Sequence, residues 1–180
     1  PLLRELVAIS SETALLGIYD GGRQEMMFVA AAECSQPVRY VNRMWEWMPV
    51  YAGASGLAIM AYLPERAQQE IISRTKLAPL TDRTITEPYR LAEQFRIIRQ
   101  NGYAFSRGQR TPGAVAIGAP IFNSSGDVIG DVCITIPEQR FDPSSETQLA
   151  EHVKRCAARI TAQLGGVPPR LAEKEVEAIA

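Results

Sequence analysis

The amino-acid sequence predicts an α+β fold, in which helices cover the faces of an antiparallel β-sheet. Two observations support this prediction. Helical and extended patterns follow one another as helix, hairpin, helices, hairpin and helix, an order typical of that class. The chain has 180 residues, of which 46% are hydrophobic, a size and composition that suit one globular domain. No internal repeat or low-complexity stretch interrupts the pattern.

The amino-terminal part predicts a short helix followed by a β-hairpin. Residues 2–10 carry apolar side chains at mostly helical spacing, which indicates an amphipathic helix. Residues 11–20 and 23–32 are two apolar runs with Gly21-Gly22 between them, a two-residue signal for a hairpin turn. This hairpin supplies the first two strands of the expected sheet.

The middle of the chain predicts one more extended segment and three helices. Residues 34–43 are expected to be extended, and the apolar run of residues 57–63 is expected to be a short helix. A polar helix is predicted for residues 65–73. Residues 88–101 form the most regular helical pattern, and Gly102 provides a stop signal after it.

The carboxy-terminal part predicts a second hairpin and a long helix. Residues 114–122 and 128–136 are expected to be strands, joined by a loop of Asn, Ser and Gly. Residues 144–164 carry an apolar stripe at helical spacing, which predicts a helix. Residues 167–180 are a polar tail with helical potential.

The charge and hydropathy of the chain argue against binding to nucleic acid or to a membrane. Lys and Arg number 19, and Asp and Glu number 20, so the formal net charge is −1. Affinity for phosphate backbones needs a surplus of Lys and Arg, and we expect the chain alone to bind DNA poorly. No apolar run approaches the roughly 20 residues that cross a bilayer.

The cysteines are three in number and widely spaced, at Cys34, Cys133 and Cys156. This pattern argues against a disulfide framework and against a zinc site, so we expect no metal and a cytoplasmic location. The chain begins with Pro1 and at once shows a helical pattern. We therefore interpret it as a fragment of a longer protein.

The second hairpin predicts a core on one face and a cavity on the other. If residues 123–126 form a four-residue loop, alternation gives one face of mostly branched apolar residues, which suits packing under helices. The other face pairs small residues with polar ones: Gly118 with Asp131, Ala116 with Cys133 and Ala114 with Thr135. Small side chains leave space above a sheet, and a few polar groups around such a space are typical of ligand sites.

Two alternatives stay open for this hairpin at the level of sequence. A helix that packs closely on the glycine and alanine residues would fill the space that they leave. A β-bulge that shifts the register by one residue would exchange the two faces, because side chains alternate with a period of two.

Five motifs follow one another in a specific order along the chain. They are residues 48–58 (MPVYAGASGLA), 101–106 (NGYAFS), 113–121 (GAVAIGAPI), 128–130 (VIG) and 134–137 (ITIP). Together they resemble the effector-binding domain of the IclR family of bacterial transcription regulators. The resemblance covers nearly the whole chain, and it depends on the order and spacing of the motifs rather than on any one of them.

The resemblance implies a GAF-like fold, with a curved antiparallel sheet between helices and an effector in one cavity. It implies a non-enzymatic domain without a cofactor, in a regulator that acts as a dimer or tetramer. Family members read DNA through an amino-terminal winged helix-turn-helix, expected outside these 180 residues. Residues 1–10 would follow the linker from that domain, residues 11–166 would bind the effector, and residues 167–180 would be a tail.

Carried over by position, the resemblance implies effector contacts at six residues: Ala54, Ser55, Ser106, Ala116, Cys133 and Thr135. Three of these also lie on the small-residue face of the second hairpin. Four further candidates precede or begin the first motif: Tyr40, Trp45, Trp47 and Met48. They can close the cavity mouth by stacking on a planar ligand, or they can form a subunit interface, where Trp and Met are also enriched.

Departures from the family pattern indicate the kind of effector. Leu57 stands where the family usually has lysine, Ser106 where some members have aspartate, and Ala116 where sensors of small carboxylates have cysteine. We therefore expect a less polar and roomier cavity. Its effector would be a small organic acid, larger or more apolar than a two- or three-carbon acid, such as an aromatic acid. Arg107 and Arg110 either pair with its carboxylate or are solvated.

Two other functions fit parts of the sequence. A GAF-type sensor domain can serve another signalling protein if a different module precedes it. A small cysteine-dependent enzyme would use Cys133 as nucleophile and would need a nearby base. His152 is the only histidine, and its place on the last predicted helix indicates a partly exposed residue. No phosphate-binding loop or HExxH helix is present.

Overall fold

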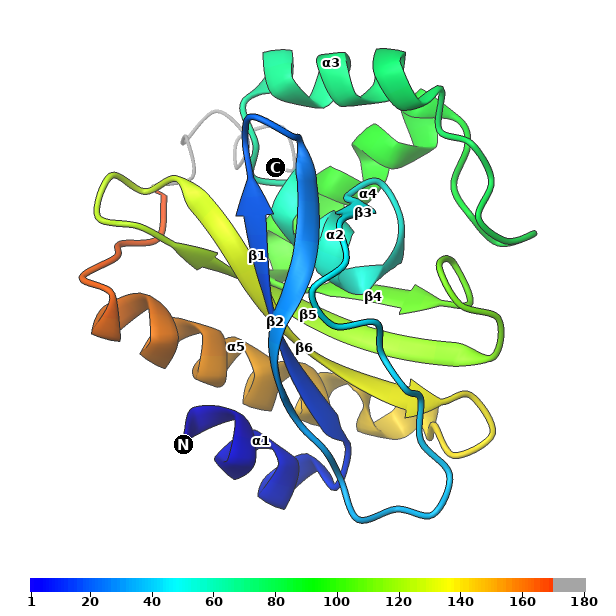
Figure 1. Cartoon of the computed structure of the whole chain (residues 1–180), viewed down its shortest axis with the longest axis vertical. Coiled ribbons are helices and arrows are strands. Elements are labelled where there is room, and N and C mark those ends of the chain that lie inside the picture. The colour runs from blue at the N-terminus through cyan, green and yellow to red at the C-terminus, as the bar shows by residue number, and fades with distance from the viewer. Residues whose placement is uncertain (170–180) are drawn as a thin grey trace, which may run out of the picture.

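The computed structural model describes residues 1–169, which form a six-stranded curled sheet with helices on both faces (Figure 1). The strands are β1 (Thr13–Asp20), β2 (Glu25–Ala32), β3 (Met48–Pro49), β4 (Ala104–Arg107), β5 (Ala114–Phe122) and β6 (Val128–Pro137). They lie in the order β3-β2-β1-β6-β5-β4, and all neighbouring strands are antiparallel. The two predicted hairpins thus meet at the centre, which confirms the predicted α+β class.

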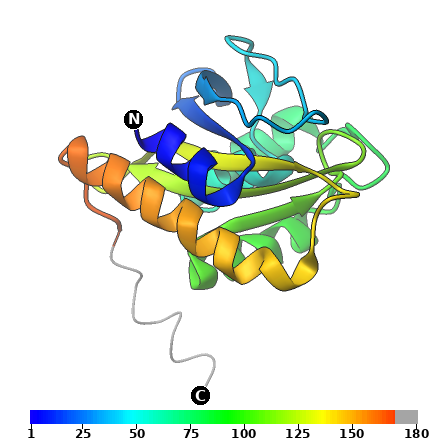
Figure 2. The ribbon, with the colours of Figure 1, turned by 90° about the horizontal axis from the view of Figure 1, so that it is seen from below.

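Helices of the described part cover the two faces of this sheet: α1 (Leu2–Ser10), α2 (Gly53–Met60), α3 (Glu65–Thr75), α4 (Pro88–Asn101) and α5 (Glu146–Gln163). α1 and α5 lie side by side on one face, as Figure 2 shows. α2 lies against the other face, and α3 and α4 complete the apolar cluster on that side. The bounds of α1 and α4 agree with the sequence prediction. The predicted tail lies outside the described residues from position 170 onward.

The first hairpin has a longer turn than predicted. Asp20 pairs with Glu25, so four residues rather than Gly21-Gly22 alone connect β1 to β2. Gln24 ends the turn with a left-handed backbone (φ 57°), and its N–H donates to the Asp20 carbonyl (2.7 Å). The prediction of a two-residue turn was wrong, because the glycines mark the place of the turn and not its length.

The segment between β2 and α2 is mostly irregular. Residues 34–43 were predicted to be extended, but they form no strand. The strand-like contact nearby is an isolated bridge between Phe28 and Met44. α2 begins at Gly53 rather than at residue 57, since all of its residues are buried and no polar face marks its period. β4 was not predicted, because a four-residue edge strand is too short to show alternation.

The second hairpin pairs two residues away from the predicted register. Ala116 lies opposite Thr135, where the sequence predicted Cys133. One step comes from a longer loop, since Phe122 pairs with Val128, and the other comes from a bulge next to that pair. Two one-residue shifts together return each side chain to its predicted face, because side chains alternate with a period of two.

Each face of the sheet has its own hydrophobic cluster. The face under α1 and α5 carries the buried apolar residues of the second hairpin: Val115, Ile117, Ala119, Ile121, Val132, Ile134 and Ile136. The face toward α2 includes Leu15, Met26 and Cys133. The predicted apolar face is confirmed, and the small-residue face points toward α2.

Candidate functional site

A cavity of about 80 Å³ lies between the small-residue face of the β5–β6 hairpin and the amino-terminal end of α2. Its wall on the sheet side consists of Phe28, Ser106, Ala114, Ala116, Cys133 and Thr135. The remaining wall consists of Tyr40, Val41, Asn42, Gly53, Ala54, Ser55, Gln109, Arg110 and Thr111. The structure thus brings together seven of the ten predicted effector contacts: Tyr40, Ala54, Ser55, Ser106, Ala116, Cys133 and Thr135.

The small-residue face of β5 serves two purposes. At Gly118 the backbone of α2 comes so close that a Cβ atom would lie 3.1 Å from the Ala54 carbonyl carbon. Ala116 and Ala114, further back along the same face, line the cavity. The alternative of a closely packed helix therefore holds at Gly118. The predicted open floor is found at Ala114 and Ala116.

β4 positions a serine at the first turn of α2. The Ser106 hydroxyl accepts a hydrogen bond from the Ala54 N–H (2.9 Å), and both residues are buried. Ser106 also pairs with Ala116 across the β4–β5 ladder, so the two lie next to each other on the cavity wall. This hydrogen bond fixes the end of α2 relative to the sheet.

Arg110 lies beside the turn that leads into α2. Its Nη2 donates to the carbonyls of Pro49 (2.6 Å) and Ala52 (2.5 Å). Gly53 leaves room for it, because a Cβ atom there would lie 3.1 Å from the Arg110 Nε. Burial lowers the pKa of Arg110 to about 10, an effect that the Asp131 carboxylate partly opposes. The guanidinium is therefore still charged at neutral pH.

The sequence predicted Asp131 on the wall of the cavity. In the structure it lies outside that wall. It is fully buried, and it packs so close to Gly17 that a Cβ atom there would lie 2.2 Å from the Asp131 Oδ1. Burial raises the pKa of Asp131 to about 7, while the Ser55 hydroxyl and the Arg110 guanidinium lower it in part. Within residues 1–169 neither carboxyl oxygen has a hydrogen-bond partner of normal geometry.

Cys133 and His152 do not form a catalytic pair. Cys133 lines the cavity on the α2 side of the sheet, whereas His152 lies on α5, against the opposite face, with its Nδ1 2.8 Å from the Arg155 Nη2. Burial raises the pKa of the Cys133 thiol well above its ordinary value. A thiol that stays protonated is a poor nucleophile, so the geometry gives no support to a cysteine-dependent enzyme.

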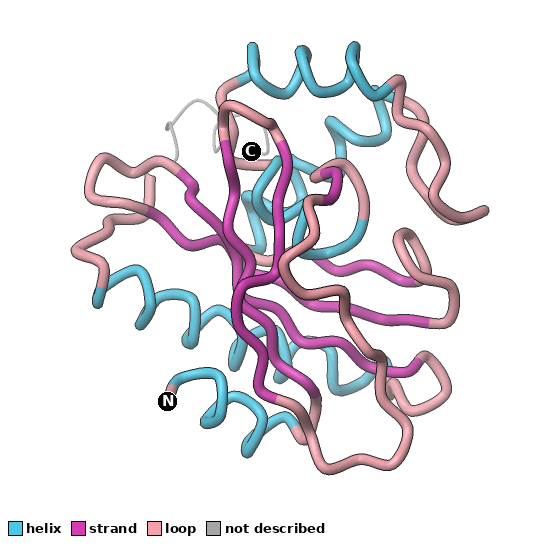
Figure 3. The backbone as a smooth tube through the Cα atoms, viewed as in Figure 1, coloured by secondary structure: helices cyan, strands magenta, loops and turns pink. Residues whose placement is uncertain are grey.

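Residues 34–47, named here the cover segment, connect β2 to β3 and are mostly loop (Figure 3). Tyr40, Val41 and Asn42 of this segment line the cavity. The Tyr40 hydroxyl donates to the Pro112 carbonyl (3.1 Å), which joins the segment to the loop after β4. One wall of the cavity is therefore a loop that has little strand pairing to hold it.

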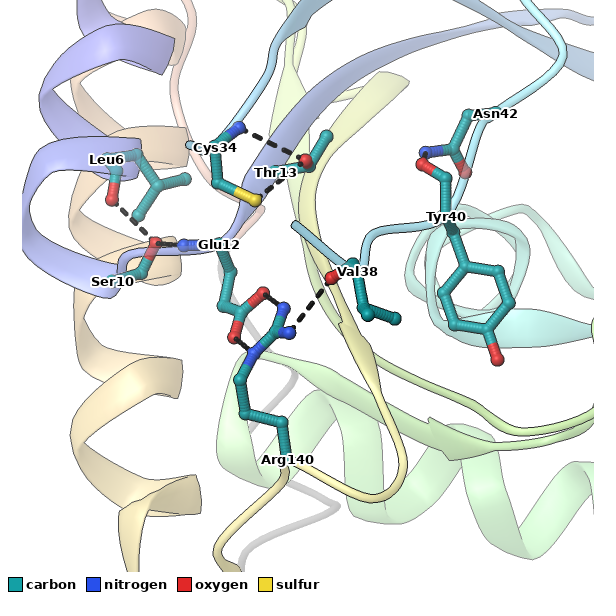
Figure 4. Close-up of polar contacts among 9 residues, drawn as sticks. All are labelled: Leu6, Ser10, Glu12, Thr13, Cys34, Val38, Tyr40, Asn42 and Arg140. Atoms are coloured by element: carbon teal, nitrogen blue, oxygen red, sulfur yellow. Dashed lines mark hydrogen bonds and ion pairs between the residues drawn. The ribbon is translucent and has the colours of Figure 1, made fainter. Parts of the chain in front are cut away.

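Tertiary hydrogen bonds hold the cover segment at its other end, as Figure 4 shows. Arg140 Nη1 donates to the Val38 carbonyl (2.9 Å), and the same guanidinium bonds both oxygens of the Glu12 carboxylate (2.7 and 2.6 Å). The Cys34 N–H donates to the Thr13 hydroxyl (3.3 Å). Because Glu12 lies two residues beyond the end of α1, one arginine joins α1 to the cavity wall.

Three of the ten predicted contacts, Trp45, Trp47 and Met48, do not line the cavity. Trp45 has a left-handed backbone (φ 63°) and a largely exposed side chain. The Arg23 guanidinium lies over the Trp47 ring at 5.1 Å, and Met48 pairs with Met26 at the sheet edge. A role at the cavity mouth and the alternative of a subunit interface both stay predictions for these three residues.

Some lining residues were missed from the sequence: Phe28, Val41, Asn42, Gln109 and Thr111. Alternation along the predicted second strand is a signal that could have identified Phe28. The others lie in loops, where no periodicity indicates which way a side chain points. Only the folded chain shows that these loops meet.

Residues 1–162 match the family model described as the bacterial transcriptional regulator IclR, C-terminal. The chain belongs to the IclR family. Among curated relatives, the HTH-type transcriptional regulator KipR of Bacillus subtilis is 33% identical over 92% of this chain and 65% of its own length. The transcriptional repressor IclR of Escherichia coli is 25% identical over 93% of this chain and 61% of its own length. This chain thus spans just under two thirds of these relatives.

Solved structures share the fold of this IclR-family domain. The Thermotoga maritima IclR structure has a TM-score of 0.85 and 29% identity, over 91% of this chain and 66% of that one. The C-terminal domain of the E. coli regulator KdgR has a TM-score of 0.78 and 24% identity, over 91% of this chain and 94% of that one. The family resemblance is confirmed, and the named relatives are transcription regulators rather than enzymes.

Two other features are absent from the described part of this IclR-family chain. No helix in residues 1–169 has the length and apolar character needed to cross a membrane. Over the same residues, no group of three or more His, Cys, Asp and Glu side chains is placed to hold a metal ion.

Proposed function

We propose that this IclR-family domain binds a small organic acid and thereby changes how the full-length regulator binds DNA. The observation that supports the proposal is the cavity over Ala114 and Ala116, where β5 carries no large side chain. Its lining combines apolar groups with a few polar ones, as ligand pockets do. The relatives KipR and BhcR are named as HTH-type transcriptional regulators, which supports the DNA-binding part of the proposal.

The effector that we propose is a carboxylic acid with an apolar or aromatic body. Phe28, Val41 and Ala116 supply apolar surface in the cavity. Ser106 and Ala116 are less polar than the aspartate and cysteine that the family resemblance associates with sensors of small acids. A ligand with a larger apolar part gains more from contact with these side chains.

The hydrogen bonds around Arg140 support a route from the cavity to α1. A ligand that displaces Tyr40 moves the cover segment, which Arg140 joins to Glu12 through its bond to Val38. α1 ends two residues before Glu12 and leads toward the amino-terminal half of the regulator. A ligand shifts such an equilibrium only by the difference between its affinities for the two states, and couplings of about 1–3 kcal/mol are typical.

We also propose assembly into a dimer or tetramer and a cytoplasmic location. Ile9 on α1 is half exposed and lies near the partly buried Leu149 of α5, so this side of the molecule offers apolar surface to a second copy. The three cysteines are free and buried, which accords with a reducing compartment.

A thermal-shift screen of the domain against glyoxylate, pyruvate, benzoate and related aromatic acids tests the proposed function. A ligand at a hundredfold excess over its Kd adds about 2.7 kcal/mol to the free energy of unfolding. Titration calorimetry then ranks the acids that stabilise the domain. Tight binding of pyruvate or glyoxylate with no binding of aromatic acids would contradict the proposed class. If no acid stabilises the domain, the sensing function itself is contradicted.

A second measurement addresses the transcriptional part of the proposal. The full-length regulator is titrated onto labelled promoter DNA with and without the best acid, and fluorescence anisotropy gives both affinities. We expect a change of about 5- to 150-fold, the range that a coupling of about 1–3 kcal/mol produces. Equal affinities would mean that the acid binds without regulating.

A further inference from the structure

We propose that Arg110 anchors the carboxylate of the effector and makes the cavity select anions over neutral analogues. The proposal rests on the proposed function, because it assigns the residue that decides which ligands the same cavity accepts. Of the described side chains that line the cavity, Arg110 alone is charged. It comes from the loop between β4 and β5, next to the amino-terminal end of α2.

Most of the hydrogen-bonding capacity of Arg110 is unused. A guanidinium has five N–H donors. The two on Nη2 bond the carbonyls of Pro49 and Ala52, and within residues 1–169 no acceptor bonds Nε or Nη1. Neither Nε nor Nη1 is among the buried unpartnered atoms of residues 1–169, so both donors stay accessible to a ligand in the cavity. A ligand oxygen would satisfy them.

No carboxylate of the described chain forms an ion pair with Arg110. Asp131 acts on it through space but lies beneath α2 and off the cavity wall. Glu12 and Glu138 pair with other arginines. Because desolvation outweighs the effect of Asp131 on Arg110, a ligand carboxylate in direct contact with the guanidinium would add a stabilising negative charge.

The guanidinium is held in place before a ligand arrives. Its two carbonyl acceptors belong to the turn that leads into α2, and Gly53 leaves the space in which its side chain lies. A group that is already ordered loses little conformational freedom on binding, which favours affinity. The planar guanidinium also matches a carboxylate better than a lysine ammonium does.

These contacts define an orientation for the ligand. The carboxylate lies at Arg110, close to Gly53 and the start of α2. The rest of the molecule lies against Phe28, Val41 and Ala116, which are the apolar part of the wall. An amide of the same shape would make the same apolar contacts but would leave the guanidinium without a counter-charge.

A titration of the unmodified domain followed by nuclear magnetic resonance is the first test. Acetate is compared with acetamide, and benzoate with benzamide, while the ¹⁵N resonance of the Arg110 Nε is followed. Each pair has nearly the same shape and differs in charge. We expect the acids to shift the Arg110 resonance and to bind at least tenfold more tightly than the amides. Acids that bind without moving that resonance, or amides that bind equally well, would overturn the proposal.

Substitutions provide the second test, with a matched control. Arg110→Met removes the charge and keeps most of the length of the side chain. Arg107→Gln removes one charge from an exposed arginine that does not line the cavity. We expect R110M to lose the preference for benzoate over benzamide, and R107Q to keep it. An equal loss in both variants would indicate a general effect of charge and would overturn the assignment.

The outcomes separate this proposal from the proposed function. Equal binding of benzoate and benzamide in the cavity contradicts the role of Arg110 and leaves ligand sensing in place. Failure of all four probes to move any cavity resonance contradicts both. If R110M does not fold, which circular dichroism would reveal, the titration of the unmodified domain still decides.

Discussion

At the scale of single residues, an added methyl group has different consequences at two positions on the same face of β5. Gly118 and Ala116 share one face of β5, but only Gly118 lies directly beneath the α2 backbone. Backbone atoms cannot move aside as a flexible side chain can. Added volume therefore strains the packing at one position and fills the cavity at the other.

This difference predicts opposite outcomes for two similar substitutions. Gly118→Ala should lower the free energy of unfolding by about 1–3 kcal/mol, because the new Cβ meets the Ala54 backbone. Ala116→Val should change it by less than about 1 kcal/mol and should weaken benzoate binding, because its added methyl groups occupy the cavity. Urea unfolding and calorimetry measure the two effects. Equal destabilisation by both would show that the space over Ala116 is not open.

Asp131 predicts a dependence of stability on pH. Its pKa is about 7 in the folded chain and about 3.9 in an unfolded one. Between these values the folded state holds a proton that the unfolded state releases, so stability falls as the pH rises from about 4 to about 7 and then levels off. Asp131→Asn, which is neutral, should remove this fall and be more stable at pH 8 by up to about 4 kcal/mol.

Urea unfolding at several pH values between 5 and 8 checks this prediction. Asp142→Asn is the control, because Asp142 is exposed and the Ser144 hydroxyl and N–H lower its pKa. That substitution should leave the slope between pH 5 and pH 7 unchanged. A slope that persists in D131N would mean that another group causes it.

At the scale of elements, the cavity has one rigid wall and one wall that depends on few bonds. The sheet wall belongs to β5 and β6, which pair along their whole length. The cover segment has only an isolated bridge and a few side-chain hydrogen bonds (Figure 4). Segments with few backbone hydrogen bonds open at low free energy, so the cover segment is the wall that a ligand can move.

Arg140→Gln should loosen the cover segment. The substitution removes the bonds to Val38 and to Glu12, whose carboxylate is mostly buried. We expect faster amide hydrogen exchange in residues 34–47 and a loss of about 1–2 kcal/mol of stability, since Arg140 is partly exposed to solvent. Arg39→Gln, which removes an exposed pair with Glu33, is the control. Equal exchange in R140Q and the parent chain would contradict this role.

At the scale of the whole molecule, a single sheet separates the cavity from the face that carries α1 and α5. The cavity lies on the α2 side, and the cluster under α1 and α5 lies on the other. Arg140 and Glu12 join the two sides next to the ends of the central strands β1 and β6. In the proposed route, a signal from the ligand would therefore pass around the ends of these two strands rather than through the core of the sheet.

The charge of the whole chain predicts that this domain alone does not bind DNA. With a formal net charge of −1 it has no surplus of cations to displace the counterions of DNA. Fluorescence anisotropy with labelled promoter DNA at about 0.15 M salt should show no binding by the domain and clear binding by the full-length regulator. Equal affinity of the domain and the full-length regulator would place a DNA-binding surface on this chain.

The sequence predicted those elements whose period of side chains is regular. α1 and α4 match their predicted bounds, and β5 does as well. β4 and the start of α2 were missed, because one is too short to show alternation and the other is apolar on all sides. The sequence also contained no sign that Trp45 has a left-handed backbone, and neither tryptophan lines the cavity.

The sequence alone determined which face of the second hairpin packs in the hydrophobic core and which face carries the small side chains. Side chains alternate along a strand, so this assignment survived a register that was wrong by two residues. The tertiary structure alone decided that the small face lines a cavity with Arg110 in its wall. That wall consists of loops, whose side chains follow no period and whose positions are set by contacts between residues far apart in the chain.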